Sequence, residues 1–110
     1  MDLFNELQLK LKELNISIKK LRETGTEYAE AERSYKVCLR EHALKLRTEK
    51  DMPVTLIQQV VYGVPEVAQK RFTRDVAEAV YNANQEAINS IKLQIRVIES
   101  QLNREWVNTK

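Results

Sequence analysis

The chain is poor in the residues that build turns, disulfides and aromatic cores. Among its 110 residues are two glycines, two prolines and one cysteine, and aromatic residues make up 6%. This scarcity of turn residues excludes an all-β fold and is typical of long helices. The single cysteine, Cys38, has no partner for an internal disulfide, so we expect a reducing, cytoplasmic compartment.

The sequence also lacks a large excess of one charge and a long apolar run. Its 18 basic and 16 acidic residues give a net charge of +2, too small to steer the whole molecule toward nucleic acid. The longest mostly apolar stretch, residues 54–67, contains two glutamines, a glycine and a proline. It is too polar for a membrane span, and the acidic start over residues 1–6 is unlike a signal peptide.

The strongest pattern present is a ladder of positions at alternating steps of three and four through the first half of the chain. Its members are Phe4, Leu7, Leu11, Leu14, Ile18, Leu21, Gly25, Tyr28, Glu32, Tyr35, Leu39, His42 and Leu46. Ten of these thirteen residues are apolar or aromatic. The spacing predicts a helix that packs lengthwise on another helix.

Two interruptions divide the chain into three predicted helices. Asp51-Met52-Pro53 ends the first pattern, and Gly63 and Pro65 interrupt the next. Since proline suits the first turn of a helix and glycine its end, we expect helices over residues 3–50, 54–62 and 65–107. The short middle helix folds the chain back. The predicted fold is one all-α domain over residues 1–110, an antiparallel, coiled-coil-like hairpin of two long helices.

Gly25 is the weak point of the first helix. Thr24 and Glu27 have the spacing of a capping box, which would start a separate helix there. The ladder nevertheless keeps its phase from Leu21 to Tyr28. We therefore expect one continuous helix, in which Gly25 lets a neighbouring helix approach closely.

The third helix has a second stripe in its latter half: Ile88, Ile91, Ile95, Ile98 and Leu102. Its first half is softer, with apolar residues that drift around the helix: Phe72, Val76, Ala79, Val80, Ala83 and Ala87. Antiparallel pairing would place Leu7 near Trp106 and Tyr35 near Val80. Trp106 then covers the end of the hairpin, or alternatively anchors a partner.

Apolar residues on the outward side of the first helix indicate a second layer of contacts. With Phe4 as heptad position a, position f holds Leu9, Ile16, Glu23, Glu30, Val37 and Leu44. The short helix is able to cover Val37 and Leu44, whereas Leu9 and Ile16 need another chain. We therefore predict a homodimer, a four-helix core made of two hairpins, with Leu9, Ile16, Val37 and Leu44 at the oligomer interface.

Cys38 and His42, four residues apart on one helix face, are half of a possible metal site or a Cys–His catalytic pair. The chain has no second cysteine or histidine, so zinc would need carboxylates or another subunit. A helix midpoint also offers no oxyanion hole. We expect a structural role for both residues, no metal or other cofactor, and no enzymatic activity.

A basic cluster suggests an alternative function. The residues with possible nucleic-acid contact are Lys70, Arg71, Arg74, Lys45 and Arg47, which the hairpin would bring to one end. Residues 55–72 resemble a helix-turn-helix with Gly63 at its turn, but Gln58, Gln59 and Gln69 replace its usual apolar or small residues. Acidic neighbours also offset the positive charge.

The second long helix has a polar zone, which consists of Asn82, Asn84, Gln85, Glu86, Asn89 and Ser90. We expect a buried polar layer that fixes the register of the two helices, opposite Gly25 and Tyr28. The other interpretation is a small recess that binds a ligand.

Two stretches, residues 25–47 and 75–106, resemble small helical proteins from phages and prophages of Gram-positive bacteria. The similar segments include Gly25-Thr-Glu-Tyr28-Ala29-Glu-Ala31 and Gln101-Leu-Asn-Arg-Glu105-Trp106. The resemblance implies a mobile-element protein in a bacterial cytoplasm and transfers no site residue. We expect a non-enzymatic protein that dimerises and binds, and by analogy inhibits, a host or phage protein. The alternative is a nucleic-acid-binding accessory of phage replication or recombination.

Overall fold

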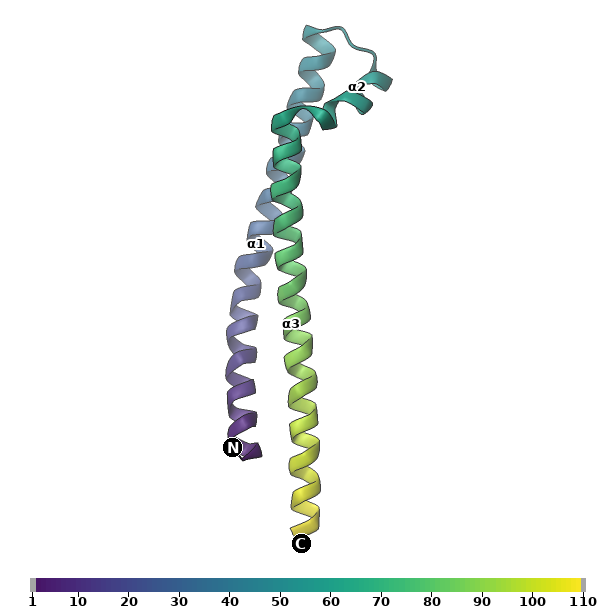
Figure 1. Cartoon of the computed structure of the whole chain (residues 1–110). Helices are drawn as coiled ribbons and strands as arrows, with labels where there is room; N and C mark the ends of the chain where they lie inside the picture. The colour runs from purple at the N-terminus through teal and green to yellow at the C-terminus, as the bar shows by residue number, and fades with distance from the viewer. Residues whose placement is uncertain (1, 110) are drawn as a thin grey trace. The chain divides into compact units, whose positions relative to one another are not determined.

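The computed structural model describes residues 2–109, and all its regular structure is helical (Figure 1). Helix α1 spans Leu3–Glu49, α2 spans Val54–Val60, a 3-10 turn (η1) follows over Val61–Gly63, and α3 spans Pro65–Thr109. Residues 2–109 contain no strand, which confirms the all-α prediction. Helix α1 is unbroken at Gly25, so the ladder was the better guide there than the capping box. Within the described range no helix has both the length and the apolar content of a membrane span.

The C-terminal end of α1 is stabilised by hydrogen bonds between residues close to it in the sequence. Asp51 has a positive φ of 47°, the left-handed conformation that aspartate tolerates better than most residues. The chain reverses there, and the N–H of Met52 donates to the Leu46 carbonyl over 3.2 Å. The Arg47 guanidinium then donates from Nη1 to the Met52 carbonyl at 3.0 Å. The Leu46 carbonyl, which the helix end would leave unpaired, is thereby satisfied, and so is the Met52 carbonyl beyond it.

The chain forms two compact units, and both long helices contribute to each. Unit 1 contains α1 up to Thr24 and α3 from Tyr81 onward, and unit 2 contains residues 25–80. This division leaves the prediction of one domain over residues 1–110 untested. In unit 1 the two helix segments lie side by side (Figure 1). Its most buried apolar side chains are Ile88, Ile95 and Ile98, with 7%, 7% and 8% of their surfaces exposed.

Unit 2 has its own apolar core, formed by all three helices. The core residues are Tyr35, Cys38, Ile57, Val61 and Val67. Partly buried residues pack around them: Leu39, Ala43, Leu46, Met52 and Val64. A seven-residue helix such as α2 is too short to be stable alone, so burial of Ile57 and Val61 against α1 holds it in place.

The buried face of α1 is rotated relative to the predicted ladder. Thr24 and Cys38, which each precede a ladder residue, are only 4% and 5% exposed. Three ladder members in the first part of the helix are exposed, Phe4, Leu11 and Ile18 at 60%, 38% and 47%, whereas Leu7 and Leu14 between them are half-buried. The apolar pattern thus located the packed side of α1 but missed the small and polar residues within it.

On α3 the packed face is longer than its apolar stripe. Buried and half-buried residues follow steps of three and four from the first turn onward: Val67, Lys70, Arg74, Ala77, Tyr81, Asn84, Ile88, Ile91, Ile95, Ile98 and Leu102. Several residues that the sequence assigned to the first half face solvent instead. Phe72 is 64% exposed, Val76 47% and Val80 45%. Lys70, Arg74 and Asn84 belong to the packed face, which an apolar pattern cannot reveal.

The register in unit 2 differs from the predicted one. The Arg74 guanidinium lies 4.8 Å from the centre of the Tyr35 ring, where Val80 was expected. About two turns further along α1, His42 contacts Glu66. The paired residue numbers rise on α1 while they fall on α3, so these segments of unit 2 are antiparallel. The prediction that Tyr35 lies near Val80 was wrong because it matched apolar residues with apolar ones. The residue that packs on the Tyr35 ring is instead charged, Arg74.

Candidate functional site

The four predicted interface residues are all exposed in this chain. The exposed fractions are 48% for Leu9, 62% for Ile16, 48% for Val37 and 63% for Leu44. Helix α2 therefore leaves Val37 and Leu44 largely open, contrary to the expectation that it covers them. The reason is that Ile57 and Val61 pack toward another side of α1, against Leu39, Ala43 and Leu46.

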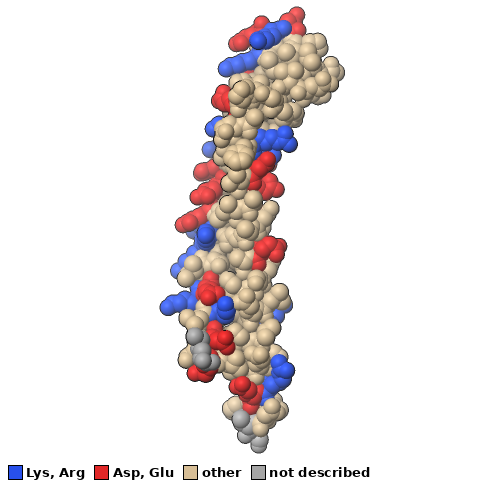
Figure 2. Space-filling model, in the orientation of Figure 1, with Lys and Arg blue, Asp and Glu red and all other residues tan. Residues whose placement is uncertain are grey.

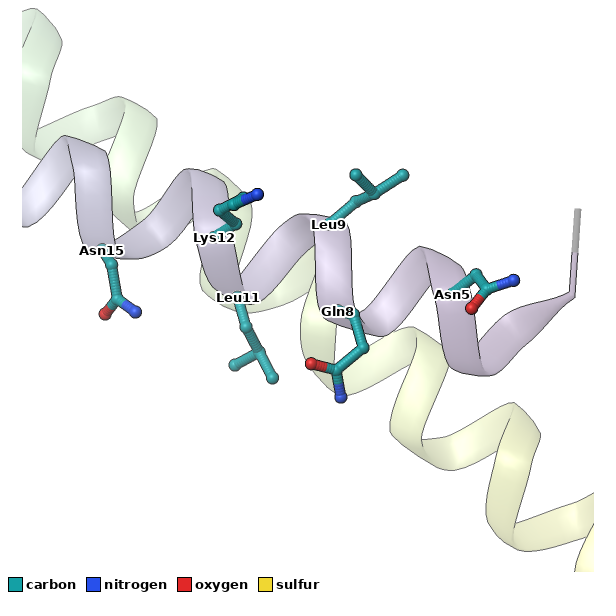
Figure 3. A pocket seen from close by; sticks show the side chains of 6 residues that line it. All are labelled: Asn5, Gln8, Leu9, Leu11, Lys12 and Asn15. Atoms are coloured by element: carbon teal, nitrogen blue, oxygen red, sulfur yellow. The ribbon is translucent and has the colours of Figure 1, made fainter.

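A shallow groove surrounds Leu9 in unit 1. Its lining residues are Asn5, Gln8, Leu9, Leu11, Lys12 and Asn15. All six belong to α1; Leu9 and Lys12 point to one side and Gln8, Leu11 and Asn15 to the other (Figure 3). The lining has no carboxylate; it consists of three amide side chains, two exposed leucines and Lys12. Such a surface suits contact with another protein chain better than enclosure of a small molecule.

A second exposed apolar surface lies in unit 2. Residues 52–65 contain no charged side chain. Val54, Leu56, Val60 and Tyr62 in this stretch are 58%, 42%, 38% and 46% exposed. The α2 region is accordingly uncharged on the face shown in Figure 2. From the sequence, this helix was expected to connect the two long helices and to cover Val37 and Leu44, although its lack of charge was also a signal for an exposed contact surface.

Most of the predicted nucleic-acid residues already have contacts within the chain. Arg74 donates to Asp75 at 2.8 Å, Arg71 lies 5.7 Å from the Tyr62 ring centre, and Arg47 bonds the Met52 carbonyl. Lys70 is half-buried, and Lys45 is exposed. On the face shown in Figure 2, groups of basic and groups of acidic side chains follow one another along the surface. The structure therefore brings these five residues into unit 2 but forms no continuous positive surface on that face.

A mixed cluster of Cys38, His42 and Glu66 lies in unit 2. Cys38 and His42 are one turn apart on α1, and Glu66 comes from the first turn of α3. The His42 Nε2 and Glu66 Oε2 atoms are 2.8 Å apart, and one ligand atom of each residue lies within 4.8 Å of the others. Sequence reasoning found the α1 pair but not Glu66, because helix packing alone brings this carboxylate near.

Burial and charge set the protonation of this cluster. Burial is the largest cause that raises the pKa of the Cys38 thiol, and the negative charge of Glu66 is the next. The hydrogen bond and the charge of His42 lower the pKa of Glu66. Cys38 therefore lacks the depressed pKa of a reactive thiolate. This arrangement does not resemble an activated cysteine nucleophile.

The polar zone of α3 contributes one buried residue, Asn84, which is 8% exposed. Its Nδ2 donates to the Ser17 carbonyl at 3.1 Å, and its Oδ1 accepts from the Thr24 hydroxyl at 2.8 Å. The other five residues of the zone are exposed. A bonded amide of this kind supports the interpretation as a register layer rather than a ligand recess, with Ser17 and Thr24 opposite it.

The end of unit 1 is less covered than expected. Trp106 is 63% exposed and Phe4 is 60% exposed, so the tryptophan does not close the end of the packed helices over Phe4. The ladder of α1 could not predict this exposure, because it contains no information on where α3 places Trp106.

No family model, no curated protein and no solved structure matches this chain. The phage-type context and the nucleic-acid alternative accordingly stay predictions from the sequence.

Proposed function

We propose that this chain is a non-enzymatic helical interaction protein that forms a homodimer and binds a protein of a bacterial host or of a phage. The observation that carries the proposal is the exposure of Leu9, Ile16, Val37 and Leu44, each 48% exposed or more. Leu9 and Ile16 stand seven residues apart, and so do Val37 and Leu44, with Glu23 and Glu30 between the two pairs. Apolar residues at this spacing are a pattern by which helices recognise other helices.

A second copy is the occupant that this face fits best. In the proposed assembly, each chain is an antiparallel hairpin, and two hairpins form a four-helix core through the outward face of α1. The net charge of +2 opposes such self-association only weakly. The groove around Leu9 contains one charged residue, Lys12, so its burial against another chain leaves few charges to desolvate.

The uncharged surface of α2 is the proposed contact for the second macromolecule. Val54, Leu56, Val60 and Tyr62 are exposed there, while Ile57 and Val61 secure the helix from beneath. Aromatic and aliphatic side chains on a supported helix provide the anchors that protein interfaces favour. The proposed setting is the cytoplasm of a bacterium, as the resemblance to phage proteins suggests.

Sedimentation equilibrium tests the homodimer. The double variant Leu9→Lys and Ile16→Lys places four charges in the proposed dimer interface. Since each half-exposed leucine or isoleucine gains about 1 kcal/mol on burial, we expect dimer affinity to fall on the order of a thousandfold.

The matched control is Gln94→Lys with Gln101→Lys, which adds the same charge at the same spacing on exposed positions of α3. It should retain dimer affinity. A wild-type chain that sediments as a monomer at micromolar concentration would contradict the homodimer, and so would an equal loss in the control.

A further inference from the structure

We propose that Cys38, His42 and Glu66 form a binding site for a divalent transition metal of the zinc class. The site goes beyond the proposed interaction function and does not depend on it. Sulfur, imidazole nitrogen and carboxylate oxygen from these side chains converge within 4.8 Å of one another. A thiolate with an imidazole selects zinc or cobalt over magnesium or calcium, which prefer oxygen ligands.

The distances require only small movements. In a tetrahedral zinc site, metal–ligand bonds of about 2.0–2.3 Å place neighbouring ligand atoms roughly 3.3–3.8 Å apart. The distance between His42 Nε2 and Glu66 Oε2, now 2.8 Å, must increase by about half an ångström. The other distances between ligand atoms are at most 4.8 Å, so each must decrease by at most about 1–1.5 Å. The side chain of Glu66 can make this adjustment by rotation, since 63% of its surface is exposed.

The helical framework fixes the other two ligands. Cys38 is 5% exposed and belongs to the core of unit 2, and His42 has a side chain that is 19% exposed. Residues four apart on a helix lie on one face, the spacing by which paired ligands bind zinc from a helix. The metal would take the place of the hydrogen bond that now joins His42 and Glu66.

Solvent reaches the cluster through a groove. Cys38 and Glu66 line it together with Arg33, Ser34, Val37, Glu41 and Lys70. An ion entering from this side meets the exposed carboxylate first and the buried sulfur last, and a water molecule from the groove can complete the fourth position.

The charges around the cluster are nearly balanced. Lys70 and Lys45 lie close enough to act on Glu66, and Glu41 acts on Cys38. The two lysines oppose a cation, and Glu41 offsets part of their effect. Metal binding releases the Cys38 thiol proton to solvent, and the resulting thiolate and the Glu66 carboxylate neutralise the divalent ion, so the loaded site carries no net charge.

Titration of the tag-free, reduced chain with Co²⁺ tests the site. Binding should produce a thiolate-to-cobalt charge-transfer band in the near ultraviolet and the visible bands of tetrahedral cobalt, and Zn²⁺ should remove both. Cys38→Ser should abolish the charge-transfer band. Glu66→Gln and His42→Gln should each weaken Co²⁺ binding by at least about tenfold. Replacing a residue that only hydrogen-bonds to a metal ligand already lowers metal affinity by about this factor.

The matched control is Glu41→Gln, which removes one negative charge from the same groove and no ligand. Its Co²⁺ affinity should stay well above that of Glu66→Gln. The proposal is overturned if the wild type shows no charge-transfer band, if the Glu41 and Glu66 variants weaken binding equally, or if only Cys38→Ser has an effect. Circular dichroism of the Glu66 and His42 variants separates lost ligands from lost fold, because both residues lie outside the buried apolar core.

Discussion

At the scale of single residues, polar groups decide details of the packing that apolar residues leave open. Asn84 is buried between Ser17 and Thr24, and both ends of its amide are bonded. In unit 2, Arg74 lies over the Tyr35 ring and bonds Asp75. A buried polar group is costly unless it meets its partner, so each of these residues favours one register over its neighbours.

Replacement of Asn84 tests the register layer. We expect Asn84→Ala to lower the free energy of unfolding by about 1–3 kcal/mol, because it leaves the buried Thr24 hydroxyl without its nearest acceptor. Denaturation by urea, followed by circular dichroism, measures this change. Asn82→Ala, at an exposed position of the same helix, should stay within about 0.5 kcal/mol of the wild type.

Removing both partners should be less harmful than removing one. In the double variant Asn84→Leu with Thr24→Val, neither side chain of the pair leaves the other without a partner, so stability should recover toward the wild-type value. A double variant as unstable as the sum of the single changes would show that the two side chains do not act as a pair.

At the scale of elements, α2 is held by tertiary contacts rather than by its own sequence. It has seven residues, and the residue before it, Pro53, makes no side-chain cap. The two buried side chains of α2 and η1, Ile57 and Val61, are 7% and 4% exposed, whereas Val54, Leu56 and Val60 face solvent. The helix therefore both closes the core of unit 2 and presents an uncharged outer surface.

Ile57→Ala tests the attachment of α2. Removing a buried isoleucine side chain costs about 2–5 kcal/mol, and we expect a value near the lower end because α2 can shift toward α1. Hydrogen exchange should show that amides of residues 54–63 lose protection more than those of residues 88–98. Gln58→Ala, an exposed neighbour, should leave protection unchanged; an equal loss in both variants would mean that α2 is not anchored through Ile57.

At the scale of the whole molecule, charge is mixed and apolar surface is plentiful. Basic and acidic residues number 18 and 16, and both signs occur together on the face shown in Figure 2. Three of the five predicted nucleic-acid residues bond or stack within the chain. These features favour recognition of protein over recognition of phosphate.

A titration with labelled single- and double-stranded DNA distinguishes the two functions. We expect no binding at about 200 mM salt, because Arg47, Arg71 and Arg74 are engaged within the chain and release few counterions. The nucleic-acid alternative instead requires binding that weakens steeply with salt and falls in the variant Lys70→Ala with Arg71→Ala. Lys92→Ala with Arg96→Ala removes the same charge from exposed positions of α3 and serves as the control.

The sequence by itself determined the all-α class, the interruptions at Pro53 and Pro65, and the continuity of α1 through Gly25, because helix periodicity and proline geometry are local properties. It also identified the outward residues Leu9 and Ile16. Only the tertiary structure decided which residues of one helix meet which residues of another. The insertion of Asn84 between Ser17 and Thr24, the place of Arg74 over Tyr35, and the approach of Glu66 to Cys38 and His42 depend on the register between helices distant in sequence. That register follows from polar pairing and packing, which no periodic apolar pattern records.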